Sequence, residues 1–267
     1  MITTTWSADR ATPDAARPPA GSAWFPLRSG PADPFRLRLY CLPHAGAGAS
    51  AYRSWAGRLG DRIDVVPVQL PGREGRFGEE PLTTADGIAD GLCAALAERG
   101  DRHWALFGHS MGALLAYEVA HRMSSAGNPP AHLVVSGMTA PPLAAGRGRP
   151  AADSLGDDEL VERIRALGGT PRDVLRSAEM MQLLLPVFRA DYRVCDDYRF
   201  TPREPLRVPV TALGGAADRG APAAGLAAWR DLTTAGYAMR LFPGGHFYLH
   251  DRLDEVLAAV RAACEGR

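Results

Sequence analysis

Three features are absent from this 267-residue sequence, and each absence removes a class of protein. No run of about eighteen apolar residues occurs, which a membrane-spanning helix would need. Residues 1–23 contain no uninterrupted apolar stretch of signal-peptide length. Neither charge sign is in excess, because 30 basic residues balance 30 acidic ones, and no basic block marks a nucleic-acid-binding surface. We therefore expect a cytoplasmic protein that binds neither a membrane nor nucleic acid.

Cysteine is scarce as well. The cysteines are far apart in the chain and form no Cys-x-x-Cys or Cys/His cluster; they are Cys41, Cys93, Cys195 and Cys264. Most of them lie in apolar runs, which favours buried free thiols in a reducing compartment.

The residues that are present predict one large α/β domain. Residues 1–21 are rich in Thr, Ala, Pro and Asp, which predicts a disordered leader, and we expect a single domain over residues 22–267. Short apolar runs alternate with helix-forming stretches, which indicates a mostly parallel, doubly wound sheet. Strands are expected at 36–42, 62–70, 104–107, 132–138, 208–213 and 237–242, with a short edge strand at 24–27.

A helical insertion interrupts this alternation. Proline and glycine become frequent over residues 140–150, and residues 153–200 have helical periodicity. We expect a helical lid over about residues 143–205, with an acyl pocket lined by Met180, Met181, Leu184 and Phe188. The alternative is a packed subdomain without a substrate role.

A Gly-x-Ser-x-Gly sequence organises the chain. Gly108-His-Ser-Met-Gly follows a short apolar run and precedes a helical stretch. This order predicts a nucleophile elbow that raises the Ser110 hydroxyl above the sheet. The backbone N–H of Met111 at the start of the helix could then stabilise an oxyanion. The small, glycine-rich loop after the first strand offers a second donor, the N–H of Ala45.

The other two members of a Ser-His-Asp triad can be sought in chain order, because this fold places the acid after the serine and the histidine last. Asp218 is the only carboxylate between Glu204 and Asp231, and it follows a predicted strand. His246 stands in a glycine turn after the last strand, and it is favoured over His250, which lies one helical turn further on. Asp218 would hold the His246 tautomer and stabilise its imidazolium.

The chain resembles the type II thioesterases of polyketide and nonribosomal peptide pathways, within the α/β-hydrolase superfamily. The resemblance covers nearly everything after the leader. It rests on Leu42-Pro-His-Ala-Gly, Gln69-Leu-Pro-Gly-Arg-Glu, Gly108-His-Ser-Met-Gly, Ser136-Gly-Met-Thr-Ala-Pro, Leu167-Gly-Gly-Thr-Pro, Arg189-Ala-Asp-Tyr, Leu213-Gly-Gly and Pro243-Gly-Gly-His-Phe-Tyr. By this resemblance Ser110, Asp218 and His246 match the family's triad, and Ala45 and Met111 match its oxyanion donors.

Two positions depart from the family pattern. The family usually has Ala-Gly-Gly after the first strand, whereas Ala47 follows Gly46 here. The family's catalytic Asp is usually followed by proline, and here Arg219 takes that place. The carboxylate of Asp218 remains, so we expect activity to survive.

The resemblance implies hydrolysis of acyl thioesters on the phosphopantetheine arm of acyl or peptidyl carrier proteins, which clears stalled or wrong acyl groups. No metal or cofactor is expected, since the arm belongs to the substrate, and the chain is expected to act as a monomer. A product-releasing thioesterase or a general carboxylesterase would use the same residues. A non-catalytic carrier-binding scaffold is the alternative outside the enzymes.

Overall fold

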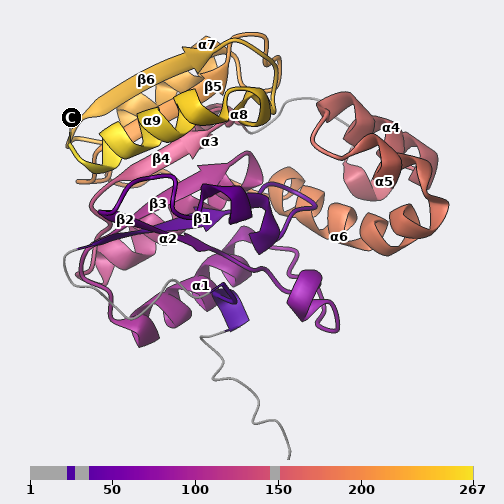
Figure 1. The fold of residues 1–267 in the computed structure, drawn as a ribbon, viewed down its shortest axis with the longest axis horizontal. Helices are drawn as coiled ribbons and strands as arrows, with labels where there is room; N and C mark the ends of the chain where they lie inside the picture. Colours follow the sequence, from indigo (N-terminus) through magenta and orange to yellow (C-terminus); the bar gives the residue numbers. More distant parts are fainter. Residues whose placement is uncertain (1–22, 28–35, 145–150, 267) are drawn as a thin grey trace, which may run out of the picture.

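The computed structural model describes residues 23–27, 36–144 and 151–266 (Figure 1). The leader predicted at residues 1–21 lies outside these residues. In the part of the chain described, six parallel strands form one sheet in the order β2-β1-β3-β4-β5-β6. The strands are β1 (Leu37–Leu42), β2 (Ile63–Pro67), β3 (Trp104–His109), β4 (Leu133–Ser136), β5 (Val210–Gly215) and β6 (Tyr237–Phe242). The expected α/β sheet is confirmed.

The inner strands are apolar on both faces because helices cover both sides of the sheet. Every residue of β1, β3, β4 and β5 is buried, whereas most of edge strand β6 is exposed. A parallel sheet covered on both faces requires such near-continuous apolar strands. The expected edge strand at residues 24–27 is wrong. Trp24 and Phe25 are buried there, and among the described residues their one backbone bond to the neighbouring segment runs from the Gln69 N–H to the Trp24 carbonyl.

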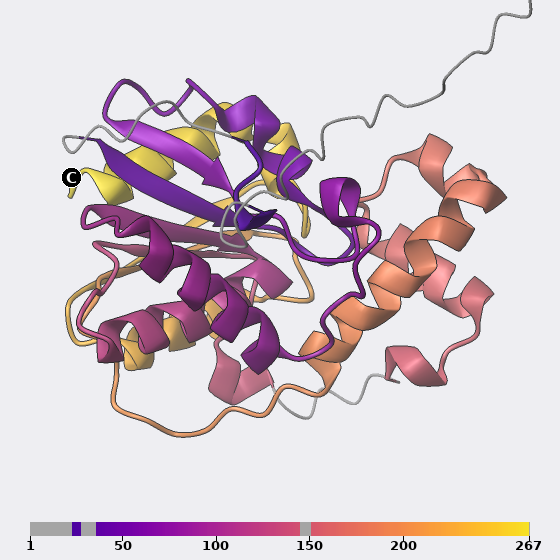
Figure 2. The same ribbon diagram turned by 90° about the horizontal axis from the view of Figure 1, so that it is seen from below.

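Two helical layers enclose the sheet (Figure 2). One layer contains α1 (Ala85–Arg99), α2 (Met111–Ser125), α7 (Ala223–Ala227) and the 3₁₀ helix η5 (Ala228–Leu232). The other contains η2 (Ala49–Trp55), α8 (Tyr248–Asp251) and α9 (Leu253–Cys264). The shorter elements are η3 (Glu74–Arg76), α3 (Pro141–Ala144) and η4 (Ala152–Ser154).

Helix α1 illustrates how the sequence sets these layers. The Thr84 side chain accepts from the Gly87 N–H at its start, and Gly100 ends it in the left-handed conformation with φ +66°. Its apolar residues recur every four positions and pack into the core; they are Ile88, Leu92 and Leu96.

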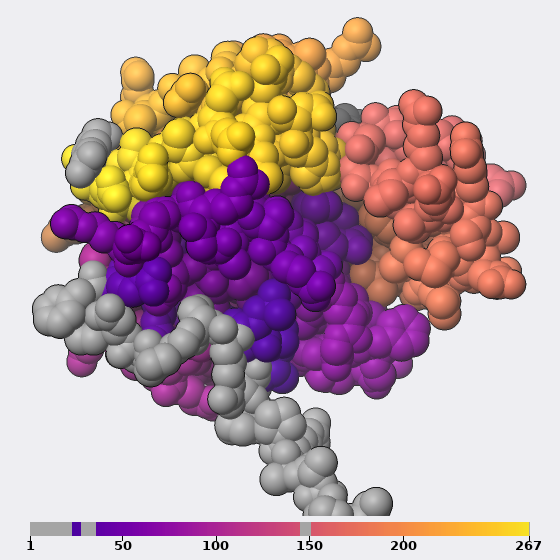
Figure 3. Space-filling model, viewed as in Figure 1, coloured from indigo at the N-terminus to yellow at the C-terminus, as the bar shows by residue number. Residues whose placement is uncertain are grey.

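Three further helices lie between β4 and β5, inside the stretch where the sequence predicts a lid. They are α4 (Asp157–Leu167), α5 (Arg172–Arg176) and α6 (Ala178–Asp196), and they form a lobe at one end of the molecule (Figure 3). This lobe has its own apolar cluster, which includes Ile164, Leu185 and Phe188. No helix in the described ranges is long and apolar enough to cross a membrane.

Candidate functional site

Ser110 occupies a strained turn between β3 and α2. Its backbone has φ +55° and ψ −121°, a conformation that costs roughly 1–3 kcal/mol for a residue with a Cβ atom. Glycines on both sides allow the strand and helix to cross closely. A Cβ on Gly108 would lie 2.1 Å from the Gly112 carbonyl oxygen, and one on Gly112 would lie 2.2 Å from the Leu42 carbonyl oxygen. The turn therefore requires both glycines of the Gly-x-Ser-x-Gly sequence.

The loop after β1 lies close to the Ser110 turn, and one of its backbone N–H groups, that of Ala45, is available. The Ala47 N–H donates to the His44 carbonyl at 3.1 Å, and Gly46 at the third position of this turn has φ +79°. The Gly46 N–H is occupied, since it donates to the Asp191 carboxylate at 2.7 Å. For the N–H groups of Ala45 and Met111 no acceptor is recorded among the described residues. Ala47 stands at the last position of the turn, which does not require glycine.

His246 and Asp218 form a hydrogen-bonded pair at the ends of β6 and β5. The Nδ1 atom of His246 lies 2.7 Å from Oδ2 of Asp218, and both side chains are largely buried. Burial opposes ionisation of Asp218, but the hydrogen bond and charge of His246 outweigh it, so the pKa of Asp218 is lowered. An ionised Asp218 accepts from Nδ1–H, which leaves Nε2 of His246 as the proton acceptor.

The Asp218 side chain also fixes its own loop. Its Oδ1 atom accepts from the backbone N–H of Gly220 at 2.8 Å and of Ala221 at 3.2 Å. These bonds form an Asx-type turn around Arg219, which is exposed. The carboxylate therefore holds this loop without the proline that the resembling family usually has after its Asp.

The competing residues lie elsewhere. Asp231 in η5 and Glu204 before β5 are exposed, and neither bonds to His246. His250 lies in α8, where its ring stacks on Phe247 with centroids 5.3 Å apart. Of the described residues, His246 alone combines an acid partner with a place in the cavity that contains Ser110.

A second serine–histidine contact is structural. His109 Nδ1 lies 2.8 Å from the Ser136 hydroxyl, which lies 2.7 Å from the Tyr248 hydroxyl. Both His109 and Ser136 are fully buried. Burial, and then the nearby charges of His246 and His44, hold the pKa of His109 well below its ordinary value. A substrate cannot reach Ser136, and this chain of bonds orients the His109 ring, whose centroid lies 5.0 Å from that of His246.

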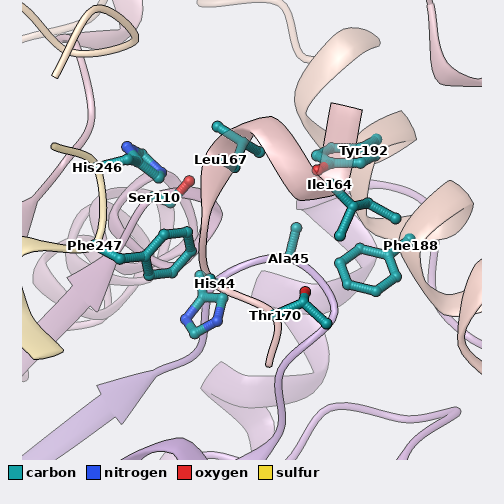
Figure 4. Close-up of a pocket in the computed structure, with 11 residues that line it drawn as sticks. His44, Ala45, Ser110, Ile164, Leu167, Thr170, Phe188, Tyr192, His246 and Phe247 are labelled. Atoms are coloured by element: carbon teal, nitrogen blue, oxygen red, sulfur yellow. The ribbon is translucent and has the colours of Figure 1, made fainter. Parts of the chain in front are cut away.

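One cavity joins the loop after β1, the Ser110 turn, the loop after β6 and the helical lobe of α4, α5 and α6 (Figure 4). Ser110 and His246 lie next to each other at one end, without a recorded hydrogen bond. The free volume of this cavity is about 30 Å³. The lining residues are His44, Ala45, Ser110, Ile164, Leu167, Gly169, Thr170, Phe188, Tyr192, His246 and Phe247.

The helical lobe contributes different side chains to the cavity from those expected. Of the four predicted lining residues, only Phe188 lines the cavity. Met180 is 43% exposed, and Met181 is buried in the lobe's own apolar cluster, against which the partly buried Leu184 packs. The lining is thus aliphatic and aromatic instead of methionine-rich. The prediction missed the lining residues Leu167, Gly169 and Thr170. The signal for them was the Leu167-Gly-Gly-Thr-Pro sequence, which matches the family.

The described part of the chain contains no group of three or more His, Cys, Asp or Glu side chains placed to hold a metal ion. The titratable side chains that line the cavity with Ser110 are His44, Tyr192 and His246, and Asp218 is bonded to His246. Burial, and then the neighbouring charges of His250 and His246, lower the pKa of His44 to about 3, so its imidazole is neutral at pH 7. This arrangement can perform acyl transfer through an activated hydroxyl.

Comparison with known proteins places these features in a family. The model of the thioesterase domain matches residues 37–264, which include every residue of the site. The chain belongs to the thioesterase family. This thioesterase is 39% identical over 227 residues to the gramicidin S biosynthesis protein GrsT of Aneurinibacillus migulanus, and the match covers 83% of this chain and 86% of GrsT.

Solved structures agree with this membership. The type II thioesterase BorB from the borrelidin biosynthetic cluster superposes on this thioesterase with a TM-score of 0.80 at 40% identity, covering 88% of this chain and 95% of BorB. The RedJ thioesterase from the prodiginine pathway of Streptomyces coelicolor has a TM-score of 0.80 at 42% identity, covering 96% and 98%. The resemblance to type II thioesterases drawn from the sequence is confirmed.

Proposed function

We propose that this thioesterase hydrolyses acyl groups from the phosphopantetheine arm of acyl or peptidyl carrier proteins, and so removes stalled or aberrant intermediates. The observation that carries the chemistry is the shared cavity of Ser110 and the hydrogen-bonded His246–Asp218 pair. The type II relatives from biosynthetic clusters support the substrate class. The free thiols of all four cysteines support a cytoplasmic location.

The first half of the reaction forms an acyl-enzyme. Ser110 Oγ attacks the thioester carbonyl while His246 Nε2 takes the hydroxyl proton, and Asp218 stabilises the imidazolium. The N–H groups of Ala45 and Met111 bind the tetrahedral oxyanion, with help from the N-terminus of α2. When the intermediate collapses, the C–S bond breaks and His246 returns the proton to the departing pantetheine thiol.

The second half releases the acid. Water attacks the Ser110 ester, with His246 again as the base, and the carboxylic acid leaves as the serine hydroxyl re-forms. Apart from the substrate and water, each step uses only side chains and backbone of this chain, and the proposed steps require no metal or cofactor. Since a thiolate leaves readily, generating the nucleophile and stabilising the oxyanion are the enzyme's main tasks.

A comparison of matched substrates tests this function. We expect a higher kcat/KM for an acyl-carrier protein than for the same acyl group on N-acetylcysteamine, and a lower value still for a simple oxygen ester. Binding energy from the carrier outside the pocket can position the thioester, which the small substrates lack. Equal kcat/KM values for the carrier substrate and the oxygen ester would instead support a general carboxylesterase.

Selectivity for acyl length should depend on Ile164, which lines the cavity from α4 and is 2% exposed. Ile164→Val removes one methylene group from the cavity wall. The ratio of kcat/KM for an acyl chain one carbon longer to kcat/KM for the chain that the wild type prefers should rise by the equivalent of about 1–3 kcal/mol. Met180→Ala is the control, because Met180 lies outside the lining and should leave the ratio unchanged. An acyl-carrier series assayed with both variants measures the ratio. A shift with Met180→Ala and none with Ile164→Val would contradict the observed lining.

A further inference from the structure

A buried carboxylate of the lid is bound to the loop that carries Ala45. Asp191 on α6 has no exposed surface. Its Oδ2 atom accepts from the Gly46 N–H at 2.7 Å and from Nη1 of Arg73 at 2.5 Å, and its Oδ1 atom accepts from Nη2 of Arg73 at 2.7 Å. The arginine contact is bidentate, which fixes direction as well as distance.

Arg73 connects the same loop to the body of the protein. It lies in the turn after β2 and is 4% exposed. Besides its pair with Asp191, it donates to the Ala47 carbonyl at 3.2 Å and to the Pro71 carbonyl at 3.3 Å. The Arg73–Asp191 pair therefore holds the N–H of Gly46 and the C=O of Ala47, two consecutive residues of the loop.

Apolar packing from the same helix supports this contact. Phe188 lies three residues before Asp191 on α6, and a Cβ on Gly46 would lie 2.1 Å from its ring. The Phe188 ring and the Asp191 carboxylate, both on α6, thus fix Gly46 from the same side. Since the peptide unit that contains the Gly46 N–H follows Ala45 directly, fixing it limits how far the preceding Ala45 N–H can rotate.

We propose that Arg73 and Asp191 are positioning residues, which hold the Ala45 N–H where it binds the oxyanion and make hydrolysis depend on the seating of α6. This inference rests on the proposed function, which makes Ala45 an oxyanion donor. A stabilising role alone explains the pair poorly. A buried ion pair seldom stabilises a fold more than apolar residues of similar volume, because both charges lose their hydration.

The double variant Arg73→Met/Asp191→Leu tests the proposal, since it removes both charges and leaves no unpaired one. We expect kcat to fall about 10- to 100-fold with KM little changed, because the oxyanion donor is displaced while substrate binding remains. Affinity for an acyl trifluoromethyl ketone should fall by the same factor. This inhibitor forms a tetrahedral adduct with Ser110, whose oxyanion occupies the same site. Asp191→Asn, which keeps an oxygen for the Gly46 N–H, should lose less.

Arg189→Met is the matched control. Arg189 is also on α6 and pairs with Asp157 at 2.6 Å, a contact within the lid that does not reach the Ala45 loop. Its kcat and its inhibitor affinity should stay near the wild-type values. Equal losses in both variants, or wild-type kcat in the double variant, would overturn the proposal.

Two further measurements separate the possible failures. Circular dichroism establishes that each variant is folded, and if the double variant is not, Asp191→Asn and Arg73→Lys take its place. Arg73→Lys retains the charge but loses the bidentate geometry, so it should also lower kcat and inhibitor affinity together. Labelling of wild-type Ser110 by a phosphonate tests the proposed function itself. If Ser110 is labelled and these variants behave as wild type, the positioning role is refuted while the proposed function stands.

Discussion

Ser110→Ala is expected to lower kcat on an acyl-carrier thioester by on the order of 10⁶-fold, because no acyl-enzyme can form without the Oγ atom. The fold should persist, since the Gly108 and Gly112 crossing that shapes the turn is unchanged. Steady-state hydrolysis measured through release of the carrier thiol gives the rate, and circular dichroism checks the fold.

Ser136 provides the control for this variant. Its hydroxyl lies within hydrogen-bond distance of His109 near the site, but it is fully buried. A serine-directed phosphonate should add one label to the wild type at Ser110, and Ser136→Ala should still be labelled there. A label on Ser136, or undiminished hydrolysis by Ser110→Ala, would contradict the assignment of the nucleophile.

Asp218→Asn is expected to lower kcat by about 10⁴-fold with little change in KM, because an amide no longer fixes the His246 tautomer or stabilises its positive charge. The 2.7 Å contact between His246 and Asp218 is the basis of this expectation. Asp231→Asn is the matched control, since Asp231 is exposed in η5 and should tolerate the change. The reverse result would make Asp231 the acid.

The same variant should show a pH-dependent loss of stability. A carboxyl whose pKa is lowered by folding stabilises the fold above its unfolded pKa of about 3.9 and loses that contribution as the pH falls through the folded value. The pKa of Asp218 is lowered in this way. The difference in Tm between wild type and Asp218→Asn should therefore be present at pH 7 and narrow only below about pH 4. A Tm difference that stays constant with pH would mean that the charge of Asp218 contributes nothing to the stability of the fold.

Local patterns made the sheet and the Ser110 turn predictable from the sequence. Gly108 is required by a contact with Gly112, four residues further on, and the positions of Asp218 and His246 follow from the ends of two strands. Such signals survive in a single sequence because the physical constraint and the residues that satisfy it are neighbours in the chain.

Contacts between distant segments were not predictable in the same way. Helical periodicity identified the apolar residues of α6, but not which of them face the cavity, so Met180 was predicted as lining and Tyr192 was missed. Arg73 and Asp191 are 118 positions apart, and each alone looks like a surface charge. The apolar Trp24 was taken as a sign of a strand, but its role is to pack into the core and not to pair in the sheet.

The most direct test of the account is intact-protein mass spectrometry of an acyl-loaded carrier protein incubated with the wild type and with Ser110→Ala. With the wild type, the carrier should lose the mass of its acyl group and keep its phosphopantetheine arm, and brief incubation should show the acyl mass on the enzyme. With Ser110→Ala both changes should be absent. Loss of the acyl group in the presence of Ser110→Ala, or an acyl-carrier that stays intact with the wild type across a panel of acyl chains, would contradict a serine thioesterase acting on carrier proteins.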